Sequence, residues 1–60
     1  MWVPVKDAAL VLGVDRSTIT RWVQAGEINT KKERLVTMVE IGECRAYKIL
    51  TAARRNLNLL

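Results

Sequence analysis

The chain has 60 residues, enough for one small domain with a modest core, and half of them are apolar, which argues against disorder. Its formal net charge is +4, with ten Lys and Arg against six Asp and Glu. No apolar run approaches the roughly 20 residues of a membrane span, and no signal-peptide pattern is present. We therefore expect a cytoplasmic protein with no membrane partner.

The cysteine and histidine content excludes several kinds of site. Cys44 is the only cysteine and histidine is absent, so an intrachain disulfide and a Cys/His zinc site are both excluded. With six scattered carboxylates, no catalytic triad, metal cluster or phosphate loop can be assembled. The sequence predicts that this segment is not an enzyme and holds no cofactor or metal, and that Cys44 is a small buried residue.

The positive charge is confined to one half of the sequence. Charges balance over residues 1–30, whereas residues 31–60 hold seven Lys and Arg against three Glu. A basic half on a small domain is typical of proteins that bind a polyanion such as nucleic acid. A solvated lysine-rich surface would give the same totals, so charge alone leaves both interpretations open.

The N-terminal segment predicts a strand and a short helix. Pro4 keeps Val3 out of the helical region, so residues 1–3 are expected to be extended. Apolar residues then occupy positions 5, 8, 9 and 12, which is the spacing of one face of a helix over 5–12. Gly13 is expected to end this helix, because glycine enters the left-handed region without steric cost.

A second helix is predicted over residues 15–25. Asp15 is a suitable N-cap, Gly26 is a suitable stop, and Ile19, Trp22 and Val23 form an apolar face. The other face has no carboxylate beyond the cap, although an ordinary solvated face mixes Glu with Lys. That face carries Arg16, Ser17, Thr20, Arg21 and Gln24.

The second half of the chain changes its pattern. Residues 34–40 are rich in β-branched residues, residues 45–49 mix apolar with basic ones, and Gly42 between them favours a turn. These features predict a β-hairpin over 34–49, preceded by a polar loop over 28–33. A short helix is predicted over 51–57. The expected fold class is therefore α+β, in a single domain over residues 1–60.

The spacing of four residues in the first half matches a helix-turn-helix. Two helices that cross closely need a small residue in the first helix, a glycine in the turn and bulky apolar residues from the second helix. Ala9, Gly13, Ile19 and Trp22 meet these requirements together. An ordinary αα-hairpin would explain the apolar spacing, but it would not explain the carboxylate-free polar face of the second helix.

The stretch "VPVKDAALVLGVDRSTITRWVQAGEI" resembles the opening of the MerR/excisionase superfamily of winged-helix DNA-binding domains. The family pattern is x-x-x-E-A-A-x-x-L-G-V-S-x-x-T-I-x-R-W-x-x-x-G-x-I, and the likeness covers about half of the chain. Asp15 replaces the usual serine but can still cap the helix. The segment between Ile28 and the predicted hairpin is longer than in most relatives.

The resemblance implies a small winged helix-turn-helix that binds double-stranded DNA. It also implies an excisionase-like or repressor-like regulator of recombination or transcription, encoded by a bacterium or phage and associated with the nucleoid. A lone domain of this type binds a single half-site weakly. We therefore also expect self-association on DNA or a recombinase or transposase partner.

Helix-turn-helix geometry places the second helix in the major groove. The residues expected to read bases are Arg16, Ser17, Thr20, Arg21 and Gln24, with Arg21 the strongest candidate. Other residues of the second helix and of the predicted hairpin, which forms the wing, are expected to contact the DNA backbone. These residues are Thr18, Lys31, Lys32, Arg34, Arg45 and Lys48. Trp2, Trp22 and Tyr47 are expected to pack rather than to stack on bases.

Two alternatives remain open from the sequence. "WV", "VKDAA" and "AYKI" resemble the N-terminal DNA-binding domain of Mu-type phage transposases, in which case catalysis would belong to another domain. The apolar end over 57–60 and the apolar hairpin would instead suit a protein-interaction module. The latter predicts association that does not depend on salt or on Arg21.

Overall fold

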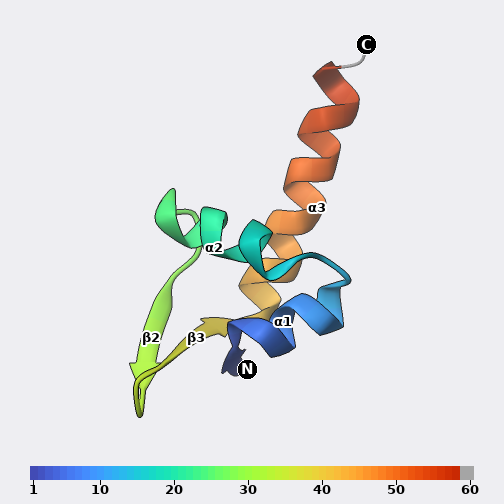
Figure 1. The fold of residues 1–60 in the computed structure, drawn as a ribbon. Coiled ribbons are helices and arrows are strands. Elements are labelled where there is room, and N and C mark those ends of the chain that lie inside the picture. Colours follow the sequence, from blue (N-terminus) through green and yellow to red (C-terminus); the bar gives the residue numbers. More distant parts are fainter. Residues whose placement is uncertain (59–60) are drawn as a thin grey trace.

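The computed structural model describes residues 1–58, which form three helices and one three-stranded antiparallel sheet (Figure 1). In chain order the elements are β1 (Trp2–Pro4), α1 (Val5–Leu12), α2 (Arg16–Gln24), β2 (Thr30–Glu33), β3 (Val36–Glu40) and α3 (Ile41–Asn58). The strand order is β1-β3-β2, so the last strand is central and the first half of the chain is tied to the second. The fold class is α+β, as the sequence predicts.

Local sequence signals set the boundaries of the first two helices. α1 ends at Gly13, whose φ of 68° lies in the left-handed region. The Asp15 carboxylate then accepts a hydrogen bond from the Ser17 amide at 2.8 Å and caps α2. Gly26, with φ 78°, follows the last turn of α2. These positions coincide with the ranges expected from the sequence.

The core lies between α1, α2, β3 and the first turns of α3. Helix α2 contributes its fully buried Ile19, and α3 contributes the fully buried Cys44. Half-buried apolar side chains from β1, α1, α2 and α3 pack around this centre. The buried apolar residues are Ala8, Ala9, Leu12, Ile19, Ile28, Val39 and Cys44.

The predicted pairing of residues 34–40 with 45–49 is wrong. Strand β3 lies within the first range, but its hairpin partner is β2, in the segment expected to be a polar loop. The turn consists of Arg34 and Leu35, which both have positive φ (51° and 68°). Sequence rules expect Gly or Asn at such positions, so this turn is not recognisable from residue type.

The segment expected to form the second hairpin strand is the start of α3. Gly42 is not in a turn, because the Glu40 carboxylate accepts a hydrogen bond from the Glu43 amide at 2.7 Å and caps the helix. A Cβ on Gly42 would lie 3.1 Å from that carboxylate, so glycine allows its close approach. Cys44 and Tyr47, three residues apart, face the core. The predicted helix over 51–57 is the second half of α3.

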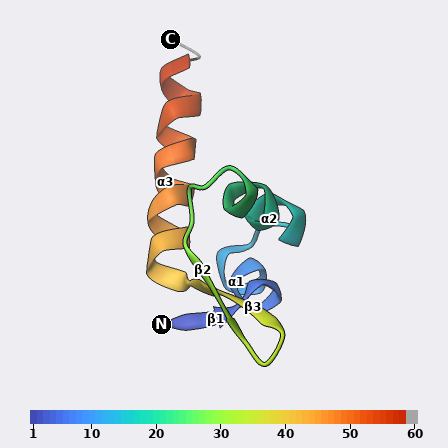
Figure 2. The ribbon, with the colours of Figure 1, turned by 90° about the vertical axis from the view of Figure 1, so that its left-hand side faces the viewer.

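Two parts of the molecule extend beyond the core, which gives overall dimensions of 45 × 21 × 18 Å. The second half of α3 projects at one end and the turn of the β2–β3 hairpin projects at the other (Figures 1 and 2). Leu57 is 69% exposed on α3, while Leu59 and Leu60 of the predicted apolar end lie outside the described residues. No helix within residues 1–58 has both the length and the apolar character needed to cross a bilayer.

Candidate nucleic-acid interface

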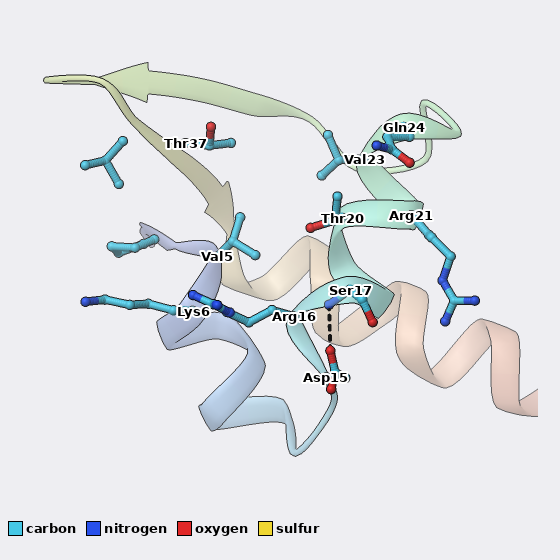
Figure 3. A pocket seen from close by; sticks show the side chains of 12 residues that line it. Val5, Lys6, Asp15, Arg16, Ser17, Thr20, Arg21, Val23, Gln24 and Thr37 are labelled. Carbon is cyan, nitrogen blue, oxygen red and sulfur yellow. Dashed lines mark hydrogen bonds between the residues drawn. The ribbon is translucent and has the colours of Figure 1, made fainter.

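A groove runs between the exposed face of α2 and the beginning of β3. Its volume is about 1080 Å³, and its charged lining consists of three cationic side chains and one carboxylate. All five residues expected to read bases contribute to it (Figure 3). The lining comprises Pro4, Val5, Lys6, Asp15, Arg16, Ser17, Thr20, Arg21, Val23, Gln24, Val36 and Thr37.

The backbone amides at the start of α2 are already occupied. The Ser17 amide donates to Asp15 Oδ1 at 2.8 Å, and the Thr18 amide donates to the Asp15 carbonyl oxygen at 3.0 Å. The hydrogen bond from the Ser17 amide is the main reason that the pKa of Asp15 is lowered. The Ser17 amide is therefore not free to bind a ligand. Thr18 is half-buried and is not part of the groove lining.

The two arginines of α2 point to opposite sides. Figure 3 shows Arg16 directed toward Lys6 of α1 and Arg21 directed to the opposite side. Arg21 Nη2 donates to Thr18 Oγ1 at 3.5 Å, which holds the guanidinium beside the helix. Since both residues are exposed and line the groove, they are placed to hold a wide anionic ligand from two directions.

Lys6 is a groove residue that the sequence reasoning missed. It lies in the first turn of α1 and extends in the same direction as Arg16 of α2 (Figure 3). Both residues line the groove and also a second, smaller hollow beside it. The position of Lys6 in the groove depends on how α1 and α2 cross. The residue pattern of α1 alone gives no indication of that crossing.

Strand alternation separates the two neighbouring lysines of β2. Lys32 lies opposite Thr37, on the same sheet face as buried Val39, and Thr37 lines the groove. Lys31 lies on the other face, where its Nζ is 4.9 Å from the centroid of the Trp2 ring. Lys32 is therefore on the side of the hairpin that faces α2, whereas Lys31 is held by Trp2. Arg34 is exposed in the turn.

Arg45 and Lys48 do not lie on the hairpin, contrary to expectation. Both are on α3, where they border a shallow hollow of about 330 Å³ formed with α1. Lys48 Nζ donates to the carbonyl oxygen of Leu12, the last residue of α1, at 2.6 Å. This hydrogen bond satisfies a carbonyl that the helix itself leaves free. The structure therefore gives Lys48 a role in joining α1 to α3.

The aromatic residues belong to the framework of the interface. Trp22 of α2 packs edge-to-face against Tyr47 of α3, with ring centroids 5.1 Å apart. Trp2 is on β1, which pairs with β3 and so supports the hairpin, as the sequence indicates. These contacts place the aromatic rings in packing roles.

Cys44 is fully buried, and burial raises the pKa of its thiol, which stays protonated near neutral pH. Within residues 1–58, no three or more His, Cys, Asp or Glu side chains come together in a group that could hold a metal ion.

Comparison with known proteins decides the family. A family model described as a helix-turn-helix domain matches residues 2–43, which is more than half of the chain. The chain belongs to the helix-turn-helix domain family. The matched range of this helix-turn-helix domain runs from β1 to the first turn of α3 and includes the whole groove lining. No curated protein and no solved structure matches the chain.

Family membership supports DNA binding by a helix-turn-helix, and the two helices of that motif in this chain are α1 and α2. The result agrees with the resemblance to excisionase-type winged domains in the sequence. The three-stranded sheet with its β2–β3 hairpin is also consistent with a winged helix-turn-helix.

Proposed function

We propose that this domain binds specific sequences in double-stranded DNA, with α2 in the major groove and the β2–β3 hairpin along the adjacent backbone or minor groove. One observation carries the proposal: the exposed polar face of α2, with Arg16 and Arg21, forms one side of a groove whose other side includes Lys6 of α1 and the beginning of β3. DNA is the polyanion whose shape suits a helix flanked by such a wing.

The basic residues in and beside the groove are expected to make different contacts with DNA. Arg16 and Arg21 are placed to contact guanine edges or phosphates from the two sides of α2. Lys6 and Lys32 extend the positive surface to α1 and β2, where contacts to the phosphate backbone add affinity rather than sequence choice. Ser17, Thr20 and Gln24 supply the remaining hydrogen-bonding groups of the α2 face.

Salt dependence and substitution test the proposal together. With about four to six phosphates neutralised, affinity for a labelled duplex should fall roughly 10²–10³-fold between about 50 and about 200 mM salt. Arg21→Ala should abolish discrimination between the best duplex and a random one, and Lys32→Ala should weaken binding to both. The absence of salt-sensitive duplex binding at micromolar protein would refute the proposal.

The biological setting is part of the same proposal. The domain acts, without catalysis of its own, in an excisionase-like or repressor-like regulator of recombination or transcription in a phage or mobile element. The resemblance to Mu-type transposases supports a second setting, as the DNA-binding domain of a larger enzyme. Footprinting of the protein on DNA from candidate recombination ends and from promoters would distinguish the regulator from the transposase domain.

A protein-interaction role has one observation in its favour. Ile49, Leu50 and Leu57 expose apolar surface on α3, at 65%, 45% and 69% respectively. If that surface were the functional one, association would be insensitive to salt and to Arg21→Ala, and it would be lost in Leu50→Glu. The DNA-binding proposal expects the opposite response in both tests.

A further inference from the structure

Leu35 occupies an unusual place for a large apolar side chain. It is 95% exposed, the highest value among the exposed large hydrophobic residues of the described chain. It lies in the turn of the β2–β3 hairpin, which projects away from the three helices (Figures 1 and 2). At this distance from the core, Leu35 adds nothing to the buried cluster that stabilises the fold.

The backbone at Leu35 is also unfavourable for leucine. Arg34 and Leu35 have φ values of 51° and 68°, so both central residues of a two-residue hairpin turn are left-handed. Asn-Gly is the preferred pair for such a turn, because glycine has no Cβ and asparagine tolerates the left-handed conformation, whereas leucine is strained in it. Strained residues of this kind concentrate where a ligand is held. The turn therefore carries a leucine that favours neither local nor global stability.

The surroundings of Leu35 match one DNA feature. Arg34 precedes it and Lys32 lies on the preceding strand, so two cations lie beside the apolar tip, together with the carboxylate of Glu33. The two residues that follow it, Val36 and Thr37, line the groove opposite α2. A duplex held by α2 in its major groove would therefore meet the hairpin turn where the neighbouring minor groove begins. Proteins that enter the minor groove frequently combine cations with an apolar residue that separates base pairs.

We propose that Leu35 enters the minor groove beside the α2 site and wedges between two base pairs, so that the DNA bends, while Arg34 contacts the groove beside it. The inference rests on the proposed DNA-binding function and adds a residue and an effect that α2 alone does not supply. It assigns to the hairpin turn a role in shaping DNA as well as in holding its backbone.

DNA bending gives the direct test. A duplex of about 20 bp, selected from a random library with the wild-type protein, would carry a donor dye at one end and an acceptor at the other. Wild-type binding should raise energy transfer between the ends. Leu35→Ala should bind about 5- to 20-fold more weakly and leave energy transfer near that of free DNA. Leu57→Ala, an equally conservative change at an exposed leucine on α3, should behave as wild type.

Leu35→Gly separates the wedge from a folding defect. Glycine relieves the left-handed backbone at this position, so the variant should unfold at a higher urea concentration than wild type. Bending should nevertheless be lost. A gain in stability with loss of bending supports the inference.

The two proposals fail in different ways. If wild type binds the duplex with strong salt dependence but energy transfer is unchanged, or if Leu35→Ala bends the duplex as wild type does, the wedge is refuted and DNA binding stands. If wild type shows no salt-sensitive binding, both proposals are refuted.

Discussion

Trp22 and Tyr47 pack edge-to-face with their ring planes at 75° and their centroids 5.1 Å apart. The two residues belong to α2 and α3, so this contact ties the helix that presents the groove to the helix that begins after the sheet. Trp22 directly follows Arg21 in α2. The orientation of the basic face therefore depends on a packing contact outside the groove.

Removal of the Tyr47 ring should loosen this contact. We expect Tyr47→Ala to lower the free energy of unfolding by about 2–3 kcal/mol, since the half-buried ring and its aromatic pairing are both lost. Tyr47→Phe keeps the ring and should cost less than about 0.5 kcal/mol. Urea unfolding followed by tryptophan fluorescence measures both values. Equal stability of the two variants would show that the contact does not support α2.

The two lysines of β2 should differ in their contribution to DNA affinity. Lys32 lies on the face of the hairpin that borders the groove, so Lys32→Ala should weaken duplex binding about 3- to 10-fold and reduce the salt slope by about one. Lys31→Ala should change affinity by less than about twofold, because Lys31 lies over Trp2 on the other face. Fluorescence anisotropy at several salt concentrations makes the comparison. Equal effects would contradict the placement of Lys32 as the groove-facing residue.

Lys48 should act on stability rather than on binding. Its ammonium donates to the Leu12 carbonyl at 2.6 Å, so Lys48→Met should lower the free energy of unfolding by about 1 kcal/mol while keeping the apolar stem. Duplex affinity should stay within about twofold of wild type when measured where both proteins are fully folded. Arg45→Met, on the same helix, is the matched control and should change neither quantity. A large loss of affinity in Lys48→Met would place that side chain on the DNA.

Glu40 should make the fold sensitive to acid. Its carboxylate accepts a hydrogen bond from the Met1 ammonium at 2.7 Å and another from the Glu43 amide, and these bonds lower its pKa from 4.5 to about 2. The unfolded chain therefore takes up a proton at higher pH than the folded chain does. The stabilisation from Glu40 is complete above its ordinary pKa of 4.5 and is lost as pH falls toward 2.

Urea unfolding measured at roughly pH 7, 4 and 2 tests this dependence of stability on the protonation of Glu40. The stability difference between wild type and Glu40→Gln should be largest at the highest pH and should shrink toward the lowest. Glu27→Gln, at an exposed carboxylate in the loop after α2, should show no comparable trend. A Glu40→Gln difference that stays constant across the three pH values would contradict the lowered pKa.

The candidate site divides into a part that sequence patterns predict and a part that they do not. The exposed face of α2 follows from the spacing of Ile19, Trp22 and Val23, because a helix with three apolar residues on one side must present the others outward. The position of Lys6 beside Arg16 does not follow from the residue pattern of either helix alone. It arises where two helices cross, and the crossing is set by packing around Ala9 and Ile19.

The hairpin shows why the second half was harder to predict. The segment at 45–49 has apolar and basic residues at intervals that suit either a short strand or a helix, and periodicity alone does not separate the two. The Glu40 carboxylate favours the helix, because Glu40 is the last residue of β3 and its side chain caps the first turn of α3. The strand that forms the hairpin with β3 is β2, which is polar along its whole length. It therefore lacks the apolar alternation by which strands are recognised.

The local features of this protein follow from its residue pattern alone. Helix bounds, the Asp15 cap, the left-handed Gly13 and the composition of the α2 face all depend on residues within about one helical turn of each other. Three relationships arise only in the folded molecule: the pairing of β2 with β3, the orientation of Lys32 toward the groove side, and the hydrogen bond from Lys48 to α1. These relationships join residues far apart in the chain, and their energies are gained only when the core brings the elements together.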